Sequence, residues 1–322
     1  MLVGALVLAA LFNVDSLVER AENKPLGASR DRALAFWHPV QDITQFVQIH
    51  RLRQLADALT GKDDDDGSSA AAFGTPVDET TATRPELRQP TAAAPLRLWV
   101  GGDSIVQVFG ESVVRLAGET GVVEPTLHYE ISTGLTRPDY FDWPAALRAD
   151  LERDDPEVVV IMFGANDAQG MELADGTVFQ RVAEPGWQRE YARRVGAVMD
   201  LLRADGRLVY WVGQPVMRDS GFDDRMAILD RIYASEAAGR PWVEYVDTRA
   251  LFADRSGSYA EYLTGPDGDA VDLRQDDGIH LTREGGDRMA NAVLDLLARE
   301  VDLTPGRATP RASPATGSPG EG

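Results

Sequence analysis

The sequence of 322 residues contains no cysteine. This absence excludes disulfide bonds, thiolate metal sites and a cysteine nucleophile. Lysine is nearly absent too, because only Lys24 and Lys62 occur among the 32 basic residues. The 52 acidic residues give a formal net charge of −20. A chain with this charge repels phosphate backbones, so we expect no nucleic-acid partner.

Long hydrophobic runs are also missing, apart from an apolar stretch at Met1–Phe12. A membrane-spanning helix needs about 20 such residues, and the stretch lacks the basic start and small-residue cleavage site of a signal peptide. Two interpretations stay open: the end of a membrane anchor that begins further upstream, or an ordinary buried amphipathic segment. The anchor is favoured, because the polar, helix-like residues that follow offer no obvious partner for so apolar an end.

The composition divides the chain into four parts. Residues 1–60 hold the apolar stretch and a helical segment, residues 61–95 have the Gly, Ser, Thr and Pro content of a linker, residues 96–303 form one domain, and residues 304–322 are a low-complexity tail that we expect to be disordered.

Within residues 96–303, short apolar runs alternate with stretches of helical period. The runs predict five strands, at Leu96–Val100, Pro125–Ile131, Val158–Phe163, Leu208–Val212 and Trp242–Val246. Strands that alternate with helices indicate an α/β domain with a mainly parallel sheet covered on both faces. In such sheets the functional site lies at the carboxyl ends of the strands.

A serine follows the first predicted strand, in Gly101-Gly102-Asp103-Ser104. The glycines allow a sharp turn into the next helix, whose free N–H groups give positive potential. A hydroxyl there can attack a carbonyl while a nearby amide supports the oxyanion. On this motif alone the alternative is that Ser104 is an ordinary helix cap. The sequence is not a Gly-x-Ser-x-Gly nucleophile elbow, because Val106 replaces the second glycine.

A histidine precedes the last predicted helix, in Asp277-Gly278-Ile279-His280. Of the four histidines only His280 lies on a strand-to-helix loop of the domain, because His128 falls inside a strand-like run. Imidazole is the base that a serine nucleophile needs, and a carboxylate fixes its tautomer. Asp277 is the predicted carboxylate and Asp276 is a rival. An incidental histidine on a surface loop is the alternative.

Two further residues follow predicted strands. Asn166, in Gly164-Ala165-Asn166-Asp167, can donate its amide to an oxyanion, or can merely form an Asx turn. Gly134 leaves a backbone N–H open to a ligand, which is weak evidence by itself. Each alternative is plausible separately. The four motifs together at one edge of one sheet favour a catalytic site.

These motifs resemble the four blocks of the SGNH or GDSL-type hydrolases, which supply Ser, Gly, Asn and His. The matching positions are Ser104, Gly134, Asn166 and His280, and the resemblance covers roughly residues 96–301. It implies a three-layer α/β/α sandwich of flavodoxin-like type with a five-stranded sheet. It also implies that Ser104, Asp277 and His280 are catalytic, that Ser104, Gly134 and Asn166 form the oxyanion hole, and that no cofactor or metal is needed.

The chain looks most like the membrane-anchored bacterial members of that family, which implies a location outside the cytoplasm and a substrate among acylated polysaccharides or cell-wall polymers. An esterase of O-acyl, notably acetyl, groups is the leading hypothesis. An O-acyltransferase with the same residues and a non-catalytic glycan-binding relative are the alternatives. Four aromatic residues expected near the rim could stack on sugar rings, although packing is the favoured explanation for any one of them: Tyr140, Phe141, Trp143 and Trp187. A hairpin expected over Tyr262–Leu273, turned by Pro266-Asp267-Gly268, would help to shape the site.

Overall fold

The computed structural model describes residues 83–204, 206–265 and 267–304. The elements of the α/β domain follow one another in the order β1 (Leu96–Gly102), α6 (Val106–Glu119), β2 (Val123–Tyr129), α7 (Trp143–Asp154), β3 (Val158–Met162), β4 (Met171–Glu172), β5 (Val178–Phe179), α8 (Pro185–Leu201), β6 (Leu208–Val212), α9 (Ser220–Ala238), β7 (Val243–Val246), η1 (Arg249–Leu251), β8 (Tyr262–Thr264), β9 (Ala270–Asp272) and α10 (Arg283–Glu300).

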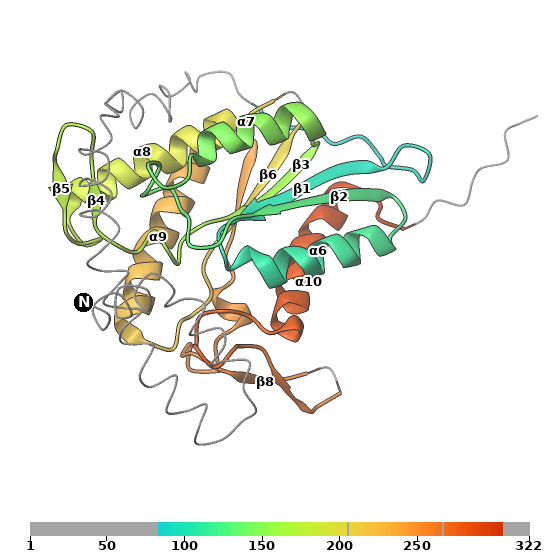
Figure 1. The fold of residues 1–322 in the computed structure, drawn as a ribbon. Coiled ribbons are helices and arrows are strands. Elements are labelled where there is room, and N and C mark those ends of the chain that lie inside the picture. The colour runs from blue at the N-terminus through green and yellow to red at the C-terminus, as the bar shows by residue number, and fades with distance from the viewer. Residues whose placement is uncertain (1–82, 205, 266, 305–322) are drawn as a thin grey trace, which may run out of the picture. The chain divides into compact units, whose positions relative to one another are not determined.

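Five strands form a central sheet in the order β2-β1-β3-β6-β7, with every pairing parallel. Helices cover both faces: α6 and α10 pack together on one side, and α7, α8 and α9 lie on the other (Figure 1). The chain order of the strands is 2-1-3-4-5, the doubly wound arrangement of flavodoxin-like folds. The predicted three-layer α/β/α sandwich is therefore confirmed.

The three inner strands are buried along nearly their whole length, because helices cover them from both faces. The five predicted strands all occur; β6 has the predicted bounds and the other four have shifted ends. The largest shift is in β2, which begins at Val123 rather than Pro125, where Val123 pairs with Leu96. Pro125 is tolerated inside β2 because β2 is an edge strand, and one side of its backbone needs no hydrogen-bond partner.

The helices α7, α9 and α10 begin where polar side chains satisfy free backbone N–H groups. Asp142 caps α7 by accepting from the Ala145 amide at 2.9 Å, Asp219 caps α9 by accepting from the Phe222 amide at 2.6 Å, and Thr282 caps α10 by accepting from the Gly285 amide at 3.1 Å. The cap of α10 fixes where the chain turns immediately after His280, so it also fixes one wall of the site.

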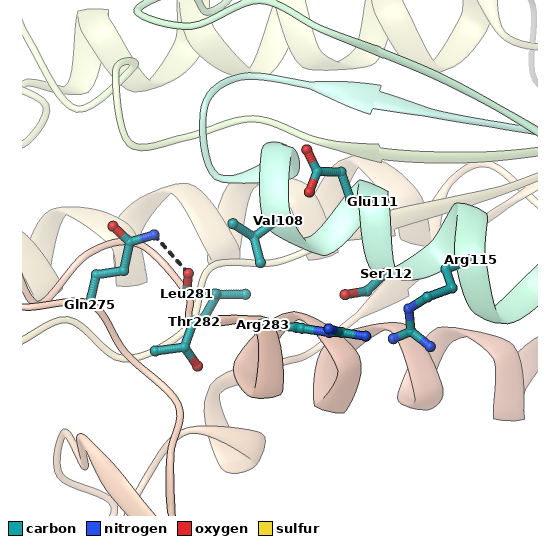
Figure 2. A pocket seen from close by; sticks show the side chains of 8 residues that line it. All are labelled: Val108, Glu111, Ser112, Arg115, Gln275, Leu281, Thr282 and Arg283. Atoms are coloured by element: carbon teal, nitrogen blue, oxygen red, sulfur yellow. Dashed lines mark hydrogen bonds between the residues drawn. The ribbon is translucent and has the colours of Figure 1, made fainter.

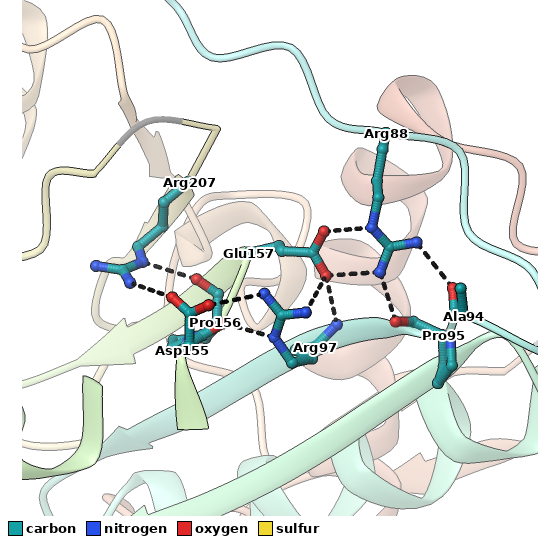
Figure 3. A network of polar contacts seen from close by, with 8 residues as sticks. All are labelled: Arg88, Ala94, Pro95, Arg97, Asp155, Pro156, Glu157 and Arg207. Atoms are coloured by element: carbon teal, nitrogen blue, oxygen red, sulfur yellow. Dashed lines mark hydrogen bonds and ion pairs between the residues drawn. The ribbon is translucent and has the colours of Figure 1, made fainter. Parts of the chain in front are cut away.

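Residues 84–95, placed by composition at the end of the linker, pack against the end of the sheet opposite to the strands' carboxyl ends. Arg88 pairs with Glu157 at 2.6 Å and also donates to the Ala94 and Pro95 carbonyls (Figure 3). Burial raises the pKa of Glu157, but the hydrogen bonds from Arg88 and the Arg97 amide outweigh it and lower that pKa. Leu87 is buried as well.

The predicted hairpin forms, since β8 and β9 pair antiparallel, with Pro266 outside the described residues. The N-terminal apolar stretch, the helical segment after it and the C-terminal tail also lie outside them. Among the helices of residues 83–304, none is long and apolar enough to cross a bilayer.

Candidate active site

Three side chains predicted to act together lie in a hydrogen-bonded row. Ser104 Oγ is 3.1 Å from Nε2 of His280, although the two residues are 176 positions apart in the chain. The other ring nitrogen, Nδ1 of His280, is 2.5 Å from Oδ2 of Asp277. Ser104 comes from the turn between β1 and α6, and the Asp–His pair comes from the turn before α10. Both turns lie at the carboxyl edge of the sheet.

Ser104 is not the cap of α6. The cap position is Ile105, and no side chain caps this helix. The neighbouring Asp103 carries the structural role instead, because its Oδ1 accepts from the Ile105 amide at 3.0 Å and its Oδ2 accepts from the Gly164 amide at 2.8 Å. Asp103 thereby ties the turn after β1 to the turn after β3. The Ser104 hydroxyl is left to face His280.

Asp277, rather than its rival Asp276, is the partner of His280. Its Oδ1 accepts from the amides of Ile279 at 2.8 Å and His280 at 2.9 Å, which leaves Oδ2 aimed at the ring. Asp276 is exposed, and its backbone carbonyl accepts from Arg218. The turn needs a glycine at position 278, where φ is +75° and an added Cβ would lie 2.5 Å from Cβ of Arg218.

A buried arginine that the sequence analysis did not single out braces this turn. Arg274 is 1% exposed and donates to the carbonyls of Gly278 at 3.1 Å, Ile279 at 2.7 Å and Val216 at 2.5 Å. Burial lowers the pKa of Arg274 to about 10, so the group stays charged at neutral pH. No motif in the sequence marks this residue. Its role depends on carbonyls that only the fold brings together.

The amide nitrogen of Asn166 is buried and has no hydrogen-bond partner within the described part of the chain. A native structure rarely leaves such a donor unsatisfied without a reason, and a substrate oxygen is one candidate partner. The Asx-turn alternative would instead use the side chain locally. Asn166 lies in the turn after β3 that Asp103 holds beside Ser104.

Gly134 lies in the buried loop after β2, against the side chain of Asp167. A Cβ at position 134 would be 2.3 Å from Oδ1 of Asp167, so only glycine fits. The same oxygen accepts from the Thr136 amide at 2.8 Å, and Oδ2 accepts from the Tyr191 hydroxyl at 2.7 Å. Asp167 therefore joins the Gly134 loop to the Asn166 turn. Asp167 is the last residue of the Gly164–Asp167 motif. Its position after a predicted strand was the one feature of the sequence that could have pointed to it.

The electrostatics of the row favour a charged Asp277. Burial raises the pKa of Asp277, but the hydrogen bonds from the His280 ring and the Ile279 amide outweigh burial and lower that pKa to about 2. Burial alone would lower the pKa of His280, and the hydrogen bond and negative charge of Asp277 outweigh this effect and raise that pKa above its ordinary 6.5. Burial raises the pKa of Asp103 to about 7, against the opposing effect of its two amide donors.

Of the aromatic residues expected near the rim, two are core residues. Trp143 and Trp187 are fully buried, and Trp143 donates its indole N–H to Thr133 Oγ1 at 2.9 Å. Phe141 packs edge-on against Trp143, with ring centroids 5.0 Å apart. Tyr140 alone of the four is exposed, at 48%. The packing explanation is therefore correct for both tryptophans.

His128 is confirmed as a strand residue of β2, where its ring pairs with the buried Asp150 at 2.5 Å. Within residues 83–304 no group of three or more His, Asp or Glu side chains is arranged to hold a metal ion. The site brings together a hydroxyl, an imidazole and a carboxylate in a row, beside an unpartnered amide donor and a buried glycine loop.

Known structures share parts of this fold. A candidate SGNH hydrolase from Slackia heliotrinireducens is 19% identical over 63% of this chain and 99% of its own, with a TM-score of 0.45. An acetylxylan esterase from Geobacillus stearothermophilus is 16% identical over 66% and 97%, with a TM-score of 0.41. The catalytic domain of a Streptococcus pneumoniae peptidoglycan O-acetyltransferase is 12% identical over 64% and 94%, with a TM-score of 0.37.

No curated protein matches the sequence. One family model does, and it spans residues 97–296, which include Ser104, Gly134, Asn166, Asp277 and His280. The match covers most of the α/β domain and more than half of the chain. The chain therefore belongs to the family described as "Protein of unknown function (DUF459)".

Proposed function

We propose that this protein is a serine-dependent hydrolase of O-acyl esters, acetyl esters above all, on a carbohydrate or cell-envelope polymer. The observation that carries the proposal is the row Ser104 Oγ, His280 and Asp277, with separations of 3.1 Å and 2.5 Å. A hydroxyl within hydrogen-bonding reach of an imidazole, itself oriented by a carboxylate, is the arrangement that activates serine as a nucleophile.

In the proposed cycle, His280 Nε2 takes the proton of Ser104 as Oγ attacks the ester carbonyl. Backbone amides of Ser104 and Gly134 and the side-chain amide of Asn166 hold the oxyanion. His280 then gives the proton to the departing alcohol. Water attacks the acyl-enzyme with His280 again as base, which releases the acid and restores the serine. Asp277 stays ionised throughout and stabilises the imidazolium.

An O-acyltransferase is the second candidate, because the same residues serve when a sugar hydroxyl replaces water in the last step. The two are separated by incubating the protein with an acyl donor and a sugar acceptor and measuring acylated sugar against free acid. We further propose that the protein acts outside the cytoplasm at the bacterial membrane. This rests on the sequence of Met1–Phe12 and on the resemblance alone.

The direct test is labelling with a fluorophosphonate, followed by peptide mapping. We expect one modified residue, Ser104, because a serine reacts when a base activates it. A panel of p-nitrophenyl esters from acetyl to octanoyl then measures the acyl preference. An unlabelled protein that turns over no ester but binds glycans would instead support the non-catalytic alternative and overturn the proposal.

Replacing Asn166 with alanine is expected to lower kcat by about 10²–10³-fold, the usual cost of losing one oxyanion donor. KM should change less, because the bond strengthens as the oxyanion forms. The matched control is Asn291→Ala, at an exposed position of α10. Steady-state kinetics on p-nitrophenyl acetate measures both variants. Equal kcat values for the two would remove Asn166 from the oxyanion hole.

The pH dependence follows from the raised pKa of His280. The base must be neutral, so kcat/KM should rise with pH through this pKa, and the midpoint of the acid limb should lie above 6.5. In Asp277→Asn the group that raises the pKa is gone, so the midpoint should move to lower pH. A full pH–rate profile of both proteins tests this, and an acid limb that moves to higher pH in the variant would contradict it.

A further inference from the structure

A cavity of about 400 Å³ opens between α6 and the start of α10. Its lining comes from three segments: the side of α6 that faces α10, the residues that follow His280, and Gln275 (Figure 2). We refer to this cavity as the α6/α10 groove. Its volume is within the range of about 300–1,000 Å³ that small-molecule sites occupy.

Both walls of the groove begin close in the chain to the proposed catalytic residues. On α6 the lining residues are Val108, Glu111, Ser112 and Arg115, and Val108 is four positions after Ser104, whose carbonyl accepts from the Gln107 amide at 3.2 Å. On the other wall Leu281, Thr282 and Arg283 directly follow His280. The groove therefore leads away from the Ser104–His280 contact on the histidine side.

The two helices approach closely at Gly286. A Cβ at that position would lie 2.9 Å from Ser112 Oγ and from the Val108 carbonyl oxygen. Ser112 is only 4% exposed, and it lines the groove. A hydroxyl that lines a cavity can donate to a ligand and accept from one.

The groove carries unpaired charges of both signs. Glu111 and Arg283 are exposed, and neither has an ion-pair partner in residues 83–304. Arg115, by contrast, is held by Asp287. Gln275 donates to the Leu281 carbonyl at 2.9 Å and keeps its side-chain oxygen free to accept. The lining thus holds both donors and acceptors, with Val108 and Leu281 as its apolar members.

We propose that the α6/α10 groove binds the alcohol part of the ester and that this alcohol is a sugar. The inference rests on the proposed function. In acylation the bond from Ser104 Oγ to the carbonyl carbon forms and the bond from that carbon to the alcohol oxygen breaks. The proton that His280 Nε2 took from Ser104 goes to that oxygen, so the alcohol must leave on the histidine side, where the groove begins.

The chemistry of the lining selects the class of alcohol. A fatty alcohol or a lipid would leave Glu111, Arg283 and the Ser112 hydroxyl without partners after displacing their water, which is costly. A sugar carries hydroxyls that both donate and accept, and so satisfies a carboxylate, a guanidinium and a buried hydroxyl together. The acyl group, held by Gly134 and Asn166 through its carbonyl oxygen, lies away from the groove.

The test compares a glycosyl ester with a small ester. In the double variant Glu111→Ala/Arg283→Ala, kcat/KM for O-acetylated xylotriose should fall about tenfold or more relative to kcat/KM for p-nitrophenyl acetate. The fall should come mainly from KM, because two charge-assisted hydrogen bonds to the sugar are lost. The ratio of octanoyl to acetyl turnover on p-nitrophenyl esters should keep its wild-type value. The matched control is Glu284→Ala/Arg299→Ala, at exposed positions of α10 outside the groove.

A second measurement does not depend on turnover. Calorimetric titration of the Ser104→Ala protein with xylotriose and with the trimer of N-acetylglucosamine should show binding of at least one sugar. The same titration of a protein that carries Ser104→Ala together with Glu111→Ala and Arg283→Ala should show no binding. Absence of binding by both sugars overturns the groove proposal even if ester cleavage is normal. If the Ser104→Ala protein binds a sugar but the wild type turns over no ester, the proposed function is overturned, and the assignment of the groove as a sugar-binding site still holds. A changed octanoyl-to-acetyl ratio in the double variant would assign the groove to the acyl chain and also overturn the proposal.

Discussion

Replacing Ser104 with alanine is expected to lower ester turnover by a factor on the order of 10⁶, as loss of the nucleophile does in serine hydrolases. The fold should survive, because among the described side chains the Ser104 hydroxyl bonds to His280 alone, and Ser104 does not cap α6. Turnover of p-nitrophenyl acetate and fluorophosphonate labelling measure the loss. Circular dichroism and thermal unfolding measure the fold.

Ser256→Ala is the matched control, because Ser256 is an exposed loop residue hydrogen-bonded to Asp254 at 2.6 Å, far in sequence from every site motif. It should keep full turnover and labelling. If purified Ser104→Ala protein retained wild-type turnover, the nucleophile would have to be another residue. Loss of turnover together with loss of the thermal transition would instead indicate that Ser104 stabilises the fold.

Replacing Asp277 with asparagine is expected to lower kcat by about 10⁴-fold, the cost of the equivalent change in a serine protease. The amide has nearly the shape of the carboxylate, so the bonds from the Ile279 and His280 amides to Oδ1 can persist. The negative charge that stabilises the imidazolium is gone, and an amide N–H facing the ring would select the wrong tautomer. Substrate binding should change much less than kcat.

The neighbouring carboxylate provides the control for that experiment. Asp276→Asn removes the same charge one residue away, from an exposed side chain that makes no bond to His280. We expect its kcat to stay near the wild-type value. The assignment is wrong if Asp276→Asn is the crippled variant and Asp277→Asn the active one. Two equally crippled variants would indicate a general effect of charge on the turn rather than a specific partner.

The buried acids around the site explain how loops from three strands hold one geometry. Asp103 joins the turns after β1 and β3, and Asp167 joins the turn after β3 to the Gly134 loop. Both carboxylates are fully buried, and each is satisfied by backbone amides, a condition for burying such a group without a large cost. Their positions hold the loops of Gly134 and Asn166, the proposed oxyanion donors, relative to Ser104.

The sequence by itself determined the fold class and the site motifs. Local signals decide both: buried parallel strands are continuous apolar runs, and the motifs at Ser104, Asn166 and His280 each stand directly after a strand or before a helix. Because parallel strands end at one edge, the order of the motifs along the chain was enough to predict that they converge. The spacing to His280 favoured Asp277 but left Asp276 as a rival, and the structure decided between them.

Only the tertiary structure decided the features that depend on side chains distant in the sequence. Arg274 braces the Asp277–His280 turn by donating to carbonyls at positions 216, 278 and 279, and no local pattern encodes that meeting. The tryptophans at 143 and 187 proved to be core residues, because packing rather than composition sets which aromatic faces are covered. The α6/α10 groove is lined by two helices more than 150 residues apart in the chain, which approach closely at Gly286. Hydrogen bonds and close packing between remote segments require the folded chain, and a one-dimensional pattern does not contain them.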